Sequence, residues 1–239
     1  MERKRFFRLD LGITNCYLLE CVGGYLQIDT AYPSSFRRYR KAIGTLGIDL
    51  NQIRYLLLTH HHDDHAGFAA RLVEETGCVP VFHQEALVPL SLGKSEETMR
   101  PVNRCINAVF SIFKMIHGEF SYPPLAVSEN SILVSGDNFD LLAGMGINGK
   151  ILHTPGHSED SISVVLSDGT AFVGDVAMNF LNFCRIRYRP IFIEDIDSVF
   201  ASWRKLTDRG AQWIYPAHGR PFSAHKLMQH TAGRSDNNT

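Results

Sequence analysis

Short apolar runs separated by turn residues dominate the first third of the chain. Residues 16–21 (CYLLEC) and 25–29 (YLQID) are two such runs, and Gly23-Gly24 between them predicts a β-hairpin. The continuous apolar run 53–58 (IRYLLL) is typical of a strand that is buried on both faces. The pattern therefore predicts that the fold begins with a sheet.

Helical periodicity alternates with these runs. Residues 34–46 carry apolar positions at helical spacing, and so do residues 68–76, where Gly77 marks the helix end. Residues 79–82 (VPVF) then predict another short strand. The order strand, loop, helix, strand between residues 53 and 82 predicts a parallel βαβ unit.

The segment from about residue 86 to 124 has a different pattern. It has no strand signal, and residues 102–117 (VNRCINAVFSIFKMIH) carry apolar side chains at helical spacing. We interpret it as a helical insertion in a single domain that spans residues 1–227. Strand patterns return afterwards at 131–134, 151–153, 161–166, 170–173 and 213–215, with a helix predicted at 196–206. The polar residues 228–239 are expected to form a disordered tail.

Composition excludes several classes of protein. The 239 residues are 44% hydrophobic and carry a formal net charge of −1, which favours neither nucleic acid nor an anionic membrane as a partner. No run approaches the ~18 apolar residues of a membrane span, and the N-terminus lacks the apolar core of a signal peptide. Five scattered cysteines without a CxxC pair predict free thiols in a reducing cytoplasm.

Candidate chemistry concentrates in residues 58–67 (LTHHHDDHAG). His60 and His62 are two residues apart, so on an extended segment both rings share a face and can reach one ion. Asp64 and His65 follow as the chain turns, and we expect them to begin a second site. A loop of this kind supplies at most two ligands for each ion, so other loops must complete both sites.

Three later residues have the position that such ligands need. His157, Asp175 and His218 each follow a short apolar run and stand next to glycine. The remaining histidines are interpreted as surface or structural residues, with His153 also a candidate for supporting a ligand: His61, His83, His117, His153, His225 and His230. We therefore expect His61→Ala to change little. Asp63 is interpreted as a solvated or ligand-supporting carboxylate.

This motif set resembles the metallo-β-lactamase fold superfamily, in the order HxHxDH, PGH, GD and HG. The resemblance implies an α/β fold, a four-layer αβ/βα sandwich, with two divalent metal ions at one edge. It implies that His60, His62 and His157 bind one ion. It also implies that Asp64, His65 and His218 bind the other and that Asp175 bridges them. Zinc is the expected metal, with iron or manganese possible, and a hydroxide shared by the ions is the implied nucleophile, with Asp64 as a proton shuttle.

Ligand types narrow the branch of the superfamily. His62 stands where the oxygen-reducing di-iron relatives have a carboxylate, and Asp175 stands where some zinc β-lactamases have cysteine. The chain thus looks like the hydrolase branch of glyoxalase II and lactonases, although Glu159 and Asp160 depart from the pattern of lactonase and thioesterase relatives and add negative charge near the first ion. We expect neither the C-terminal glutathione domain of glyoxalase II nor the basic arm of tRNA-processing nucleases.

Two segments bear on the substrate. The insertion is mainly apolar and aromatic, which favours a lid or substrate wall, although core packing or a dimer contact fits the same pattern. Its large apolar residues are Leu87, Leu90, Leu92, Met99, Phe110, Phe113, Met115 and Phe120. Arg185, Arg187 and Arg189 follow Asp175 and either recognise a carboxylate or phosphate or form a solvated loop.

These observations favour a cytoplasmic dinuclear metallohydrolase. The leading hypothesis is hydrolysis of an ester, thioester or lactone of a small, partly apolar substrate. The alternatives are a phosphodiesterase or nuclease that uses the same metals, and a metal-containing small-molecule sensor with negligible turnover. We expect a small-molecule substrate and no nucleic-acid or membrane partner, while a homodimer remains open.

Overall fold

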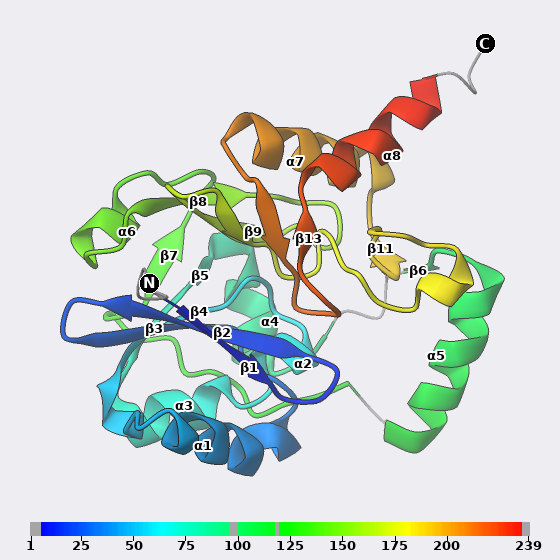
Figure 1. Cartoon of the computed structure of the whole chain (residues 1–239). Helices are drawn as coiled ribbons and strands as arrows, with labels where there is room; N and C mark the ends of the chain where they lie inside the picture. The colour runs from blue at the N-terminus through cyan, green and yellow to red at the C-terminus, as the bar shows by residue number, and fades with distance from the viewer. Residues whose placement is uncertain (1–5, 96–99, 118–119, 236–239) are drawn as a thin grey trace.

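The computed structural model describes residues 6–95, 100–117 and 120–235. It contains two β-sheets that face each other (Figure 1). The first sheet has the order β1 (Phe6–Asp10), β2 (Asn15–Cys21), β3 (Gly24–Ile28), β4 (Ile53–Leu57), β5 (Val79–His83) and β7 (Ile132–Val134). The first three strands are antiparallel and the rest run parallel. The predicted hairpin is β2–β3, and the predicted βαβ unit is present between β4 and β5.

The second sheet is formed by the later part of the chain. Its order is β13 (Phe222–Ser223), β12 (Trp213–Tyr215), β10 (Thr170–Phe172), β9 (Ile162–Leu166) and β8 (Gly149–His153). The pairs β8–β9, β9–β10 and β12–β13 are antiparallel, whereas β10 and β12 are parallel. Parallel β10 and β12 therefore end at the same edge of this sheet.

Successive side chains of a strand point to opposite faces of the sheet, so the buried residues form separate layers. In β2, Leu18 packs in the cluster with α1 (Phe36–Thr45) and α3 (Ala69–Thr76), whereas Tyr17 and Leu19 point to the other side and pack between the sheets. Phe172 of the second sheet joins that inter-sheet cluster. Helix α7 (Ile196–Asp208) and residues of α8 (His225–Ser235) cover the outer face of the second sheet. The predicted four-layer αβ/βα sandwich is confirmed.

The insertion contains α4 (Leu87–Leu92), the two-residue strand β6 (Arg100–Pro101) and α5 (Arg104–His117). The later part of the insertion, with β6 and α5, lies to one side of the sandwich (Figure 1), whereas α4 packs against the core of the first sheet through Leu90. Strand β6 pairs with β11 (Phe192–Ile193), a pairing that the sequence pattern did not predict because two residues are too few to show a period. The two short helices α2 (Asp63–Ala66) and α6 (Leu141–Gly144) complete the elements used below.

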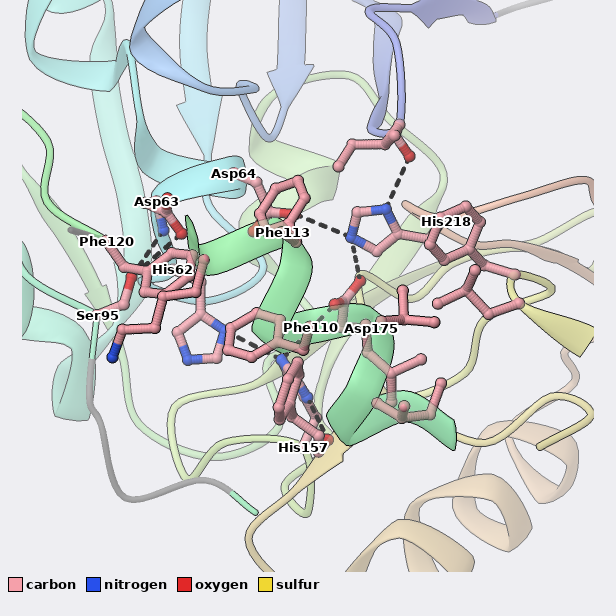
Figure 2. Close-up of a pocket in the computed structure, with 18 of the residues that line it drawn as sticks. His62, Asp63, Asp64, Ser95, Phe110, Phe113, Phe120, His157, Asp175 and His218 are labelled. Carbon is pink, nitrogen blue, oxygen red and sulfur yellow. Dashed lines mark hydrogen bonds and ion pairs between the residues drawn. The ribbon is translucent and has the colours of Figure 1, made fainter. Parts of the chain in front are cut away.

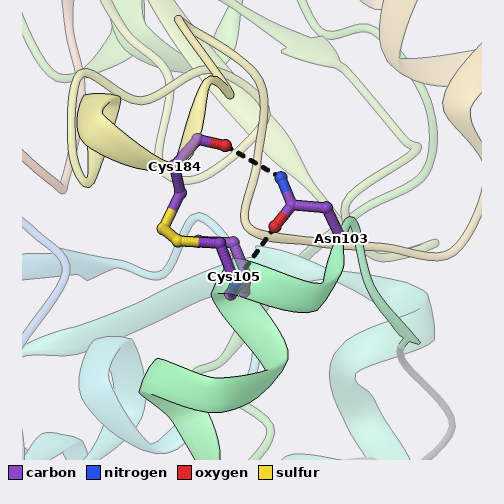
Figure 3. Close-up of a disulfide and its surroundings, with 4 residues drawn as sticks. Asn103, Cys105 and Cys184 are labelled. Carbon is purple, nitrogen blue, oxygen red and sulfur yellow. Dashed lines mark hydrogen bonds between the residues drawn. A yellow bond between two sulfur atoms is a disulfide. The ribbon is translucent and has the colours of Figure 1, made fainter.

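Two cysteines correct the expectation of free thiols. Cys105 at the start of α5 forms a disulfide with Cys184, although the two are separated by 79 residues (Figure 3). Asn103 strengthens the same junction, because its amide donates to the Cys184 carbonyl and its side-chain oxygen accepts from Ile106 N, each at 2.9 Å. Because the two cysteines are far apart in the sequence, their pairing could not be predicted from it. The other cysteines are free: Cys16, Cys21 and Cys78.

The C-terminal segment also differs from its expected state. Residues 228–235 belong to α8, whereas a disordered tail was expected from residue 228, and residues 236–239 lie outside the described residues. Within the described part of the chain, every helix is too short or too polar to cross a membrane.

Candidate metal centre

Four loops that leave strand ends meet at one edge of the sandwich. The first follows β4 and carries His60 in a bend and His62 in extended conformation; the chain then turns into α2, whose first turn carries Asp64 and His65. The loops after β8, β10 and β12 bring His157, Asp175 and His218 to the same place. The structure thus brings together all seven side chains that the sequence motif singled out, at the strand ends where α/β sheets commonly place ligands.

Three imidazoles form the first group. The Nε2 atom of His157 lies 3.2 Å from His60 Nε2 and 3.1 Å from His62 Nδ1. Burial lowers the pKa of all three rings, and the neighbouring imidazoles lower the pKa values of His60 and His62 further. The rings are therefore neutral with converging nitrogens, which is the form in which histidine binds a metal.

The second group combines two imidazoles with a carboxylate. His218 Nε2 lies 3.0 Å from Asp64 Oδ2, and His65 Nε2 lies 3.6 Å from Asp64 Oδ1. Burial lowers the pKa of His218, but Asp175 and Asp64 outweigh burial and raise this pKa to about 10. A divalent cation at this group would displace that proton, so its binding is coupled to proton release.

Asp175 lies between the two groups (Figure 2). Its Oδ1 atom is 3.4 Å from the Nε2 atoms of both His65 and His218, and its Oδ2 atom is 3.7 Å from His157 Nε2. One carboxylate therefore faces both groups with different oxygens.

Outward hydrogen bonds fix the orientation of four of the imidazoles. The bonded pairs are His60 Nδ1 with Thr59 Oγ1 (3.2 Å), His65 Nδ1 with Asp29 Oδ2 (2.9 Å), His157 Nδ1 with the Phe192 carbonyl (2.9 Å) and His218 Nδ1 with the Ile13 carbonyl (2.8 Å). Each arrangement uses Nδ1 on the outside and leaves Nε2 facing the centre. Such partners orient a metal-binding ring and set its tautomer.

Asp29 is the supporting residue for which sequence reasoning assigned no role. Besides His65, its carboxylate accepts from Thr59 N and Thr59 Oγ1, both at 2.7 Å. It sits at φ 55, a left-handed conformation that aspartate tolerates better than most residues. An acidic residue directly after the buried strand β3 was the available signal. The carbonyls of Ile13 and Phe192 leave no signal in the sequence, since every residue has one.

Gly174 allows the loop of Asp175 to approach the first loop. It has φ 51, and a Cβ atom there would lie 2.4 Å from Thr59 Oγ1. Any larger residue would push Asp175 away from the histidines, so this glycine is part of the geometry of the centre.

The donors fit divalent cations. His65 Nε2 and Asp175 Oδ1 are buried and within ion-pairing distance of each other, yet neither has a hydrogen bond in the described part of the chain. A bound cation would satisfy both atoms, which are otherwise costly to bury. Imidazole with carboxylate ligands suits zinc, iron or manganese.

His61 proves to be buried and paired. Its Nδ1 atom lies 3.1 Å from Asp160 Oδ1, both side chains are almost fully buried, and the Tyr122 hydroxyl donates to the His61 carbonyl. The carboxylate of Asp160, expected to add negative charge near the first ion, therefore lies against the His61 ring.

The other expected structural residues also have defined positions. His83 stacks on His153 with ring centroids 4.2 Å apart, and the His153 ring is hydrogen-bonded to the Glu159 carbonyl. His225 and His230 are exposed on α8, and the side chain of His117 lies outside the described residues. Asp63 belongs to neither donor group; its backbone N–H donates to Ser95 Oγ, and burial and then Asp64 raise its pKa to about 7.

A cavity of about 300 Å³ opens beside the centre. Five of the seven candidate ligands reach it: His62, Asp64, His157, Asp175 and His218. The insertion supplies much of the opposite wall through Ile106, Val109, Phe110, Phe113 and Phe120 (Figure 2). Of the other apolar residues of the insertion, Leu90 is in the core, Leu87, Leu92 and Met115 are exposed, and Met99 lies outside the described residues. One face of α5 is therefore a cavity wall rather than core.

The arginines after Asp175 do not line this cavity. Arg185, Arg187 and Arg189 border a separate hollow together with Gln229 and His230 of α8. Of the two interpretations of these arginines, recognition of an anionic group beside the metals is therefore not supported, whereas a solvated loop fits the exposure of Arg185 and Arg187.

Comparison with known proteins gives matches across most of the chain. The family model described as the metallo-beta-lactamase superfamily matches residues 9–218. A beta-lactamase-like protein 2 homolog of Drosophila melanogaster is 25% identical over 207 residues, which cover 86% of this chain and 58% of that protein. The lactamase-like protein GME11357 of Pestalotiopsis microspora is 24% identical over 92% of this chain and 54% of its own length. The chain thus spans little more than half the length of these relatives.

Solved structures share the fold. The metallo-beta-lactamase family protein TTHA1429 of Thermus thermophilus superposes with a TM-score of 0.68 at 19% identity, covering 99% of this chain and 82% of that one. The archaeal superfamily protein of Sulfolobus tokodaii gives 0.66 at 18% identity, covering 99% and 88%. Identities this low describe architecture and leave the substrate to the site itself.

Proposed function

The chain belongs to the metallo-β-lactamase superfamily, and we propose that it is a dinuclear metallohydrolase that cleaves an ester, thioester or lactone of a small, partly apolar substrate. The observation that carries this proposal is the position of Asp175, whose two oxygens face two separate groups of donors at the floor of an apolar cavity. Zinc is the metal we expect.

The candidate ligands would have separate roles. His60, His62 and His157 would hold one ion, Asp64, His65 and His218 the other, and Asp175 would touch both. Divalent ions supply Lewis acidity and lower the pKa of water that they bind. Asp64 also reaches the cavity and would hold or pass a proton there, while the aromatic wall excludes bulk water from the reacting group.

The cavity wall supports an acyl or aryl substrate over a phosphodiester. The residues of the insertion that line it are mostly apolar, and the three arginines that gave a phosphodiesterase its best support border another hollow. A sensor with negligible turnover has no observation in its favour beyond the presence of the cavity.

The test is an assay of the zinc-reconstituted protein against a panel of acyl esters, thioesters and lactones, with bis-p-nitrophenyl phosphate alongside. We expect turnover of at least one carbonyl substrate and little phosphodiester cleavage. Rapid cleavage of the phosphodiester with no carbonyl turnover would establish the alternative enzyme. No turnover in either arm, with tight small-molecule binding, would favour the sensor.

A further inference from the structure

The face of helix α5 that lines the cavity is apolar along most of its length and carries a basic residue near its end. Ile106, Val109, Phe110, Phe113 and Lys114 all line it, at the spacing i, i+3, i+4, i+7 and i+8 that places side chains on one side of a helix. The first four are apolar and the last is a cation. Eight residues of α-helix extend about 12 Å, so the wall is apolar for most of that distance and then becomes basic.

The apolar part of the wall is aromatic and well packed. The ring of Phe110 lies 4.4 Å from that of Phe192 and 5.2 Å from that of Phe120, and Phe113 lies 6.3 Å from Tyr32. These contacts join α5 to the loops that border the metal centre. The disulfide between Cys105 and Cys184 holds the start of the same helix. The wall is therefore an ordered surface against which an apolar chain or ring can pack.

Lys114 is the only lysine or arginine among the described residues that line the cavity. Its side chain is exposed, and it has no ion pair with a described residue. The cavity also has three acidic side chains. Asp63 and Asp64 lie on α2, and Asp64 and Asp175 are candidate metal ligands. The cavity thus has metal donors at its floor, aromatic rings along its side and one solvent-reaching cation.

We propose that Lys114 selects substrates that carry a carboxylate, which its ammonium group would hold while an apolar segment packs on the aromatic wall. An ammonium group is a point charge suited to one carboxylate, whereas phosphate recognition commonly uses arginine clusters, which this cavity lacks in its described lining. The substrate class is then an amphipathic acid ester, thioester or lactone with an apolar segment between its two oxygen-bearing ends. This inference rests on the proposed hydrolase function for the cleaved bond.

The experiment compares three p-nitrophenyl esters of equal acyl length: hexanoate, the adipate monoester and 6-aminohexanoate. They end in a methyl group, a carboxylate and an ammonium. The zinc-loaded protein is compared with Lys114→Met, which keeps an apolar side chain of similar length, and Lys114→Glu. Lys41→Met is the matched control, since Lys41 is exposed on α1 and does not line the cavity. Binding of adipate and of hexanoate themselves is measured by calorimetry.

We expect the wild-type protein to prefer the adipate monoester in kcat/KM and adipate in binding. Lys114→Met should reduce both preferences by about fivefold, as for a partly screened ion pair. Lys114→Glu should shift the preference to the aminohexanoate ester, and Lys41→Met should keep the wild-type ratios. Added salt should weaken the wild-type preference.

The two proposals fail differently. If no ester is cleaved but adipate binding still depends on Lys114, the hydrolase proposal fails and the anionic subsite stands. If the wild type shows no preference for the carboxylate in turnover or in binding, or if Lys114→Met leaves that preference intact, the inference about Lys114 is overturned.

Discussion

The floor and the wall of the cavity are built in different ways. The floor consists of side chains from strand ends, and four of its imidazoles are each held by a hydrogen bond to a neighbouring carbonyl, hydroxyl or carboxylate. The wall consists of one helix of an insertion that contacts the body through ring packing, a two-residue strand pair and a disulfide. The floor is thus held mainly by the sandwich, and it meets the wall at one point, where the Phe192 carbonyl orients His157. We expect the floor to carry the chemistry and the rest of the wall to determine the choice of substrate.

The largest effect is expected from removing the carboxylate that faces both donor groups. Asp175→Ala should abolish hydrolysis and reduce the metal content, because the loss affects two ions at once. The rate should fall by more than about a hundredfold, the upper range for residues that only orient a ligand. Metal analysis and initial rates on the preferred ester measure this. Asp208→Ala, on the exposed end of α7, is the matched control. Full activity of Asp175→Ala would remove Asp175 from the centre.

The second effect concerns stability, and here the buried position of His61 predicts a larger change on His61→Ala than the sequence did. Removal of the imidazole leaves Asp160 buried without its partner, which typically costs about 3 kcal/mol of unfolding free energy. Urea unfolding measures it. His61→Ala combined with Asp160→Ala should recover part of the loss, since no charge is then stranded. Asp160→Ala alone completes the cycle: if the losses of the two single variants simply add up to that of the double variant, the pair is not coupled.

The same pair predicts a pH dependence. Burial opposes ionisation of Asp160, but the hydrogen bond and charge of His61 outweigh burial, so the pKa of Asp160 lies below its usual value. A carboxyl group with a depressed folded-state pKa stabilises the protein above its unfolded pKa of about 4, and the contribution is lost as pH falls through the folded value. The difference between wild type and His61→Ala should therefore shrink in acid. A constant difference down to low pH would contradict this account.

The third effect tests the support beneath the floor. Asp29→Asn keeps the shape of the side chain but loses the charge that holds His65 and Thr59. Metal affinity should fall by about ten- to a hundredfold, measured by competition with a chelator. Asp10→Asn, exposed on β1, is the matched control. If Asp29→Asn binds metal as tightly as the wild type, the floor does not depend on this carboxylate.

The contrast between floor and wall also explains what the sequence could predict. His60, His62, Asp64 and His65 stand in one short motif, and the later candidates follow strands with clear patterns, so the donor cluster could be predicted from the residues. The four-layer sandwich was what the resemblance to a known family implied. The pairing of Cys105 with Cys184 could not be predicted, because 79 residues separate them and neither has a local motif. The direction of Arg187 depends on how its loop packs against α8, and sequence spacing does not contain that information.

The smallest expected effect concerns the attachment of the wall. Replacing both Cys105 and Cys184 by serine removes the covalent link between α5 and the loop that contributes Phe192. The ordering of the wall would then have to occur on binding, so KM for an aromatic or long-chain ester should rise by about threefold while kcat stays near the wild-type value. A reductant should have the same effect on the wild type and none on the double variant, and Cys21→Ser, which alters a free thiol, serves as control. A fall in kcat with unchanged KM would show instead that the wall helps to position the metal donors, and the separation between floor and wall would have to be given up.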